Sequence, residues 1–125
     1  MLKNIKVAKV KGFINPPSQP ISSGDLVTWE IDEIKSSEAL VAKSTDPNLS
    51  FDLKGAAGNK TLKATLTYRP PTSVIPTYEV PYSLYIDNGS LTAVSGGYLV
   101  IDTIGPPTGP SFRPHDEDEP DAERL

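Results

Sequence analysis

The chain of 125 residues has no cysteine, a single histidine (His115) and a single methionine, at position 1. Without cysteine, the chain cannot form disulfides, a cysteine nucleophile or a thiolate metal site. One histidine likewise excludes a multi-histidine metal site. A chain of this length is the usual size of one domain and can fold around its own core without such supports. We therefore expect one folded domain that uses no cofactor.

Long apolar runs are also missing. No segment approaches the length of a membrane span, and lysines interrupt the apolar residues of the opening segment MLKNIKVAKVKGF, which leaves no signal-peptide core. The 13 prolines and 9 glycines argue against long helices. We expect a protein without membrane contact whose compartment is the cytoplasm, unless a leader was removed.

Net charge is absent from the body of the chain. Residues 1–112 hold ten lysines and arginines against ten aspartates and glutamates, whereas residues 113–125 hold two against six. The net charge of −4 therefore lies in the last residues. A neutral body with an acidic end does not attract nucleic acid, so we expect no nucleic-acid partner.

Apolar and polar residues alternate through most of residues 2–103, which is the period of half-buried strands. Turn signals recur roughly every ten residues, as in β-sandwiches and Greek-key barrels. The pattern predicts an all-β, antiparallel Greek-key sandwich of about seven or eight strands, cupredoxin-like or immunoglobulin-like. Residues 1–104 form the expected domain, and residues 105–125, rich in proline, glycine and acid, form the expected tail.

Two local signals are sharper than the rest. Val27, Trp29 and Ile31 share one face of a strand that follows the Gly24-Asp25 turn, which predicts that Trp29 lies in the core. Asn88-Gly89 predicts a hairpin with a type I′ turn.

The segments Phe13-Ile14-Asn15-Pro16, GDLVTW (24–29), Tyr82-Ser83-Leu84-Tyr85 and GYLVI (97–101) occur in this order. In that order the chain resembles the cupredoxins over about residues 3–103, most strongly at GDLVTW. The resemblance implies a Greek-key sandwich.

The copper site of that family is not carried over. A blue-copper centre uses two histidines and a cysteine. The resemblance places the first histidine near Glu38-Ala39 and the other ligands within residues 87–96, and neither segment holds a histidine or cysteine. We expect no copper binding.

Carboxylates offer two further candidate sites. Acid–base chemistry could use the acidic residues in and next to the expected strand that holds Val27, Trp29 and Ile31. A calcium site could use acidic residues from several turns. The first group is Asp25, Glu30, Asp32, Glu33 and Glu38; the second is Asp46, Asp52, Asp87 and Asp102. A solvated outer face and ordinary turns explain both groups more simply.

Two surfaces could bind a partner. Four lysines are spaced along the first expected strand. They either bind a polyanion or protect a sheet edge, and they could also bind the acidic tail. Tyr85 has the parity opposite to the apolar residues of its strand and lies near a proline-rich loop that begins at Arg69. The predicted interaction surface comprises Lys3, Lys6, Lys9, Lys11, Arg69, Tyr85, Asp116, Glu117, Asp118 and Glu119.

The sequence therefore favours a non-enzymatic binding or structural module, with a protein partner or self-association. The alternative is an enzyme or a divalent-metal protein that uses a surface carboxylate cluster.

Overall fold

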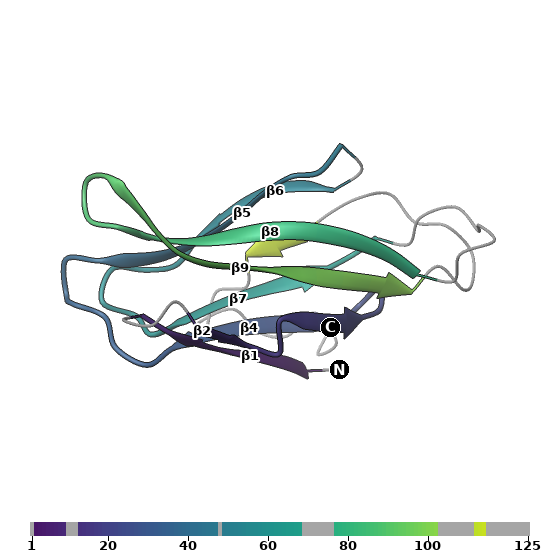
Figure 1. The fold of residues 1–125 in the computed structure, drawn as a ribbon, viewed down its shortest axis with the longest axis horizontal. Helices are drawn as coiled ribbons and strands as arrows, with labels where there is room; N and C mark the ends of the chain where they lie inside the picture. Colours follow the sequence, from purple (N-terminus) through teal and green to yellow (C-terminus); the bar gives the residue numbers. More distant parts are fainter. Residues whose placement is uncertain (1, 10–12, 48, 69–76, 103–111, 115–125) are drawn as a thin grey trace, which may run out of the picture.

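The structure is a computed structural model that describes residues 2–9, 13–47, 49–68, 77–102 and 112–114. These residues form two five-stranded sheets that pack face to face (Figure 1). The prediction of an all-β sandwich is confirmed. None of the described segments forms a helix with the length and apolarity to cross a bilayer.

Sheet A has the strand order β10-β7-β4-β1-β2, and sheet B has the order β3-β9-β8-β5-β6. The strands of sheet A are β1 (Leu2–Ala8), β2 (Phe13–Asn15), β4 (Leu26–Ile31), β7 (Thr61–Leu66) and β10 (Phe112–Pro114). The strands of sheet B are β3 (Ser18–Ile21), β5 (Ala39–Thr45), β6 (Ser50–Lys54), β8 (Thr77–Asp87) and β9 (Leu91–Asp102).

The sheets are mixed, which corrects the expectation of an antiparallel fold. β1 pairs parallel with β4, and β3 pairs parallel with β9. Both parallel pairs arise because the start of the chain changes sheets: β2 turns back beside β1 in sheet A, and after Pro16-Pro17 the chain continues as β3 in sheet B. Proline cannot donate to a ladder, so the two prolines separate the short strands and raise the strand number above that expected.

The core lies between the sheets and is built from one face of each strand. Trp29 of β4 is fully buried, as its parity predicts. Its indole Nε1–H donates a hydrogen bond of 3.0 Å to the hydroxyl of Tyr82 on β8, and the two rings meet edge to face at 5.4 Å. Burial raises the pKa of Tyr82 to about 12, so this hydroxyl stays neutral and keeps its proton at ordinary pH.

Phe112 corrects the predicted domain boundary at residue 104. β10 pairs antiparallel with β7, and the Phe112 side chain is 8% exposed. Its ring lies 5.9 Å from that of Trp29 and 4.9 Å from that of Phe51. The domain therefore extends at least to Pro114. The proline-rich composition around this segment gives no sign of a three-residue strand whose Phe112 side chain lies in the core.

The β8–β9 hairpin is confirmed, but its turn differs from the expected type. A type I′ turn needs a positive φ at both central residues. Gly89 has a φ of 108°, whereas no residue other than glycine has a positive φ in the described part of the chain. Asp87 and Leu91 pair across the hairpin, so Asn88, Gly89 and Ser90 form a three-residue loop, and a loop of that length needs the positive φ only once.

Replacing the buried indole tests the centre of the core. Trp29→Ala should lower the free energy of unfolding by roughly 3–5 kcal/mol, because it removes a large buried ring and leaves a cavity. Urea unfolding measures the loss. Trp29→Phe, which keeps one ring but loses the hydrogen bond and part of the buried volume, should lose less. A native tryptophan emission typical of full exposure to water would contradict the buried position.

Truncation tests the corrected boundary. A chain that ends at residue 111 loses the burial of Phe112 and should be about 3–5 kcal/mol less stable than one that ends after Pro114, as for a Phe-to-Ala change in a core. Phe112→Ala in the full chain should reproduce most of the loss. Equal urea midpoints for the two truncated chains would show that β10 adds nothing to the core.

Candidate functional site

β1 is an interior strand, which corrects the interpretation of its lysines as protection of a sheet edge. It lies between β4 and β2, and β2 forms that edge of sheet A. The lysines also do not share one face. Lys3 and Lys9 have the parity of the buried Ile5, at the two ends of the inward face, whereas Lys6 has the opposite parity.

Lys6 and Lys9 already have partners within the domain. Lys6 Nζ forms an ion pair with Glu30 of the neighbouring strand β4, and both side chains are largely exposed. Lys9 Nζ lies 2.5 Å from Glu38 Oε1, and these side chains are only 21% and 9% exposed. Two of the four lysines of the predicted basic rim are therefore neutralised by intramolecular pairs.

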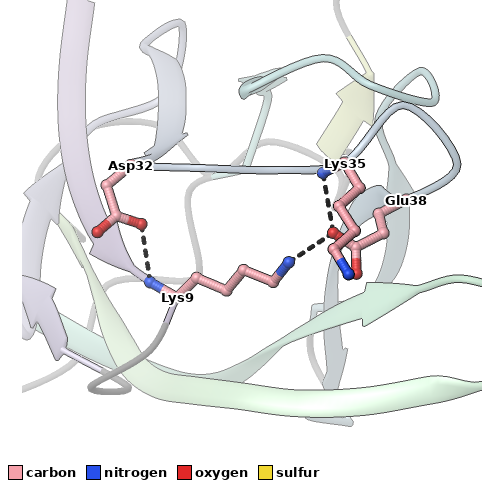
Figure 2. A network of polar contacts seen from close by, with 4 residues as sticks. All are labelled: Lys9, Asp32, Lys35 and Glu38. Carbon is pink, nitrogen blue, oxygen red and sulfur yellow. Dashed lines mark hydrogen bonds and ion pairs between the residues drawn. The ribbon is translucent and has the colours of Figure 1, made fainter.

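The Lys9–Glu38 pair is the centre of a polar network at one end of the sandwich (Figure 2). Glu38 Oε1 also accepts the backbone N–H of Lys35 at 2.9 Å, and the backbone N–H of Lys9 donates to Asp32 Oδ1 at 2.9 Å. Lys9 and Asp32 follow strands of sheet A, whereas Glu38 precedes β5 of sheet B. The network therefore joins the two sheets and shapes the crossover from β4 to β5.

The charge state of Glu38 follows from these contacts. The hydrogen bond from the Lys9 ammonium, followed by the backbone N–H of Lys35, holds the pKa of Glu38 below its ordinary value near 4.5, against a smaller opposing effect of burial. A carboxyl with a lowered pKa is ionised at neutral pH and has no proton to give. The geometry gives Glu38 the role of an ionised partner that fixes a loop.

The other carboxylates near β4 have structural contacts of the same kind. Glu30 pairs with Lys6 on the outer face of sheet A, and Asp25 Oδ2 accepts the N–H of Ser22 in the β3–β4 turn at 2.8 Å. Glu33 is exposed. The candidate acid–base group is thus spread over a sheet face, a turn and a crossover.

The four aspartates of the candidate calcium site do not come together either. Asp46 accepts the hydroxyl of Tyr78 at 2.9 Å, and Asp87 lies at the opposite end of β8, where it pairs with Lys54 at 2.9 Å. Asp52 pairs with Lys43 across β5 and β6 at 3.6 Å. Among the described residues, no three acidic, histidine or cysteine side chains gather closely enough to hold a metal ion.

The charges on the outer face of sheet B lie around an uncharged centre. The Lys43–Asp52 ion pair joins β5 and β6, and the Lys54–Asp87 ion pair reaches from β6 over β5 to the end of β8. The centre of the outer face of β3, β9 and β8, which we call the tyrosine face, carries tyrosine, proline, serine and small residues. The tyrosine face comprises Ser18, Pro20, Pro81, Ser83, Tyr85, Gly96, Tyr98 and Val100, with Glu79 and Asp102 toward one end and Asp87 at the other.

Tyr98 is the residue that sequence reasoning missed. It lies between Ser18 and Pro81 in register, and it is 46% exposed. Tyr85 points to the same face, as its parity predicts, and is half-buried. The signal for Tyr98 was the same as for Tyr85, because Leu99 and Ile101 beside it have the buried parity.

Several predicted interaction residues lie outside the described residues, and their role stays a prediction. They are Lys11, Arg69, Asp116, Glu117, Asp118 and Glu119. Docking of the acidic tail on the lysines of β1 is likewise untested, although Lys6 and Lys9 would have to exchange existing partners.

Comparison of the sequence with models of known protein families and with curated proteins found no match. The site is therefore interpreted from its own geometry.

The lowered pKa of Glu38 predicts a pH-dependent stability. Glu38 favours the folded state above pH 4.5, and this contribution disappears as the pH falls through the lower folded pKa. Glu38→Gln should therefore lower the urea midpoint at neutral pH, with a difference that shrinks in acid. Glu33→Gln at an exposed neighbour serves as the control. A loss of equal size at neutral and acidic pH would mean that the glutamate charge contributes nothing.

Proposed function

We propose that this chain is a non-enzymatic binding or assembly module and that the tyrosine face contacts its protein partner. The supporting observation is the contrast between the uncharged centre of the tyrosine face and its charged surroundings. Ion pairs cover the β5–β6 side of sheet B, whereas the tyrosine face presents a 46% exposed Tyr98 among prolines and small residues. Tyrosine is enriched in protein interfaces because its ring gives contact area and its hydroxyl still forms hydrogen bonds.

The partner should present an apolar surface with a few hydrogen-bonding groups, since the middle of the tyrosine face has no charge to pair. Prolines contribute rigid contact area, because their rings lose little freedom on binding. Pro20 of β3 and Pro81 of β8 are both exposed, and they pair in register with Val100 and Tyr98 of β9. A cytoplasmic location is part of the proposal.

The contacts of the carboxylates favour this role over the enzymatic alternative. Glu38 and Asp87 both have a lowered pKa, Glu38 mainly through Lys9 and Asp87 mainly through the N–H of Gly89 and then Lys54. A general acid at neutral pH needs a raised pKa. These groups instead stabilise a crossover and a hairpin.

A cupredoxin-like topology remains the proposed kinship. Its support is spatial: the resemblance assigns a ligand-bearing pocket to Glu38-Ala39 and residues 87–96, and Ala39 pairs directly with Asp87 in the structure. The two segments thus meet at one end of the sandwich, next to the Lys9–Glu38 pair. In this chain, the end of the sandwich where the family holds its copper ligands contains the Lys9–Glu38 ion pair, which joins the two sheets.

Substitution of Tyr98 tests the proposed surface. Affinity capture from the native source, followed by mass spectrometry, names a candidate partner, and calorimetry with the purified partner then gives the affinity. Tyr98→Glu should weaken binding at least about tenfold, because it places a charge in the centre of an apolar contact.

Phe13→Glu is the matched control, since Phe13 is 56% exposed on β2 of the other sheet. It should leave the affinity unchanged. Equal binding by Tyr98→Glu and the unmodified chain would reject the tyrosine face as the contact surface. Thermal unfolding of both variants establishes that each is folded.

A further inference from the structure

The free edge of β6 differs from the other sheet edges of the described chain. β2 and β10 are the outer strands of sheet A, and β3 and β6 those of sheet B. Proline follows β2 at Pro16, lies within β3 at Pro20 and ends β10 at Pro114. Proline at an edge blocks pairing with another strand. β6, Ser50–Lys54, has five residues and no proline.

The ladder to β5 shows which backbone groups of β6 point outward. The N–H of Gly55 donates to the carbonyl of Leu40 at 2.8 Å, next to the opposed pair Val41 and Lys54. Hydrogen-bonded and non-bonded pairs alternate along an antiparallel ladder. Phe51 and Leu53 therefore bond to β5, whereas the N–H and C=O groups of Ser50, Asp52 and Lys54 face the edge.

The side chains of β6 hold the strand in place and leave its edge charged. Phe51 and Leu53 point into the core and are 9% and 1% exposed. Asp52 and Lys54 lie on the outer face, where each has a single ion-pair partner and remains 67% and 60% exposed. Opposite charges two residues apart thus accompany the outward-facing backbone groups.

We propose that β6 pairs antiparallel with β6 of a second copy of this chain, so that the two copies of sheet B become continuous. In the proposed register, Asp52 of each copy faces Lys54 of the other, because both positions carry outward backbone groups. The two-fold axis passes beside Leu53, and each contact occurs twice, as an isologous interface requires.

The charges of Asp52 and Lys54 favour this register and favour a second copy of β6 as the partner. Opposite charges placed directly across two strands stabilise the pair, whereas like charges destabilise it. The competing register that centres on Asp52 would place two aspartates face to face. An antiparallel copy of β6 presents the same two charges in reverse order, so each charge lies opposite its counter-charge.

The inference rests on the proposed assembly role but uses a different surface from the tyrosine face. Tyr98 lies on β9, which β8 and β5 separate from β6. Tyr98→Glu should therefore leave dimerisation unchanged, and the two proposals can fail independently.

Charge complementation tests the pairing. Sedimentation of the full chain should show a mass that rises with concentration from the 13.4 kDa monomer toward the dimer. Lys54→Glu and Asp52→Lys should each weaken self-association by about tenfold or more, because each places like charges opposite one another twice. An equimolar mixture of the two variants should associate again, since one edge is then acidic and the other basic.

Lys60→Glu, the same charge change at an exposed position outside β6, is the matched control and should associate like the unmodified chain. Amide exchange gives a second readout. The amides of Asp52 and Lys54 should become more protected as concentration rises, whereas that of Leu53, bonded to β5, should be protected throughout.

A chain that stays monomeric at millimolar concentration would overturn the proposal. Association that Lys54→Glu and Lys60→Glu affect equally, or that leaves the exchange of Asp52 and Lys54 unchanged, would place the interface elsewhere and overturn it as well.

Discussion

The contact between Trp29 and Tyr82 joins the two sheets at the middle of the core. An indole that loses water on all sides must find an acceptor for its N–H, and the hydroxyl of Tyr82 provides it from the opposite sheet at 3.0 Å. Phe112 packs against the same indole from β10. Because these rings come from β4, β8 and β10, the spacing and relative position of both sheets depend on how they pack.

Ion pairs add further contacts at one end of the sandwich and on the outer face of sheet B. Lys9 and Glu38 join the sheets at one end, where the chain crosses from β4 to β5. On the outer face of sheet B, Lys54 of β6 reaches Asp87 of β8 over the strand β5 between them. The small Ala39 and Val41 of β5 lie on that face and are only 3% and 2% exposed. Ion pairs thus cover apolar surface as well as balance charge, since lysine stems are themselves apolar.

Features that depend on alternation could be predicted from the sequence. The parity of Trp29 and Tyr85 predicted the correct face for each side chain, because a strand has a period of two wherever it lies in a sheet. The same rule, applied to lysines spaced three apart, would have shown that Lys6 and Lys9 face opposite ways.

Features that depend on which strands become neighbours could not be predicted. The pairing of β1 with β4 sets the interior position of the lysine strand, and no local pattern encodes the direction of that pairing. The ion pair of Lys9 with Glu38 joins residues 29 positions apart. Phe112 escaped notice because one apolar residue among prolines has no period to read.

The position of Phe112 also has a consequence for the order of folding. During synthesis the ribosome releases this side chain after the other core residues of the described chain, so the remaining strands of both sheets emerge before the Phe112 ring can close the interior. Parallel pairs such as β1 with β4 add contacts between distant segments, and such contacts slow folding. Until β10 joins β7, the indole of Trp29 lacks one of its ring contacts. A chain that has not yet docked β10 therefore leaves part of its core uncovered, and apolar surface that is exposed before folding is complete favours aggregation.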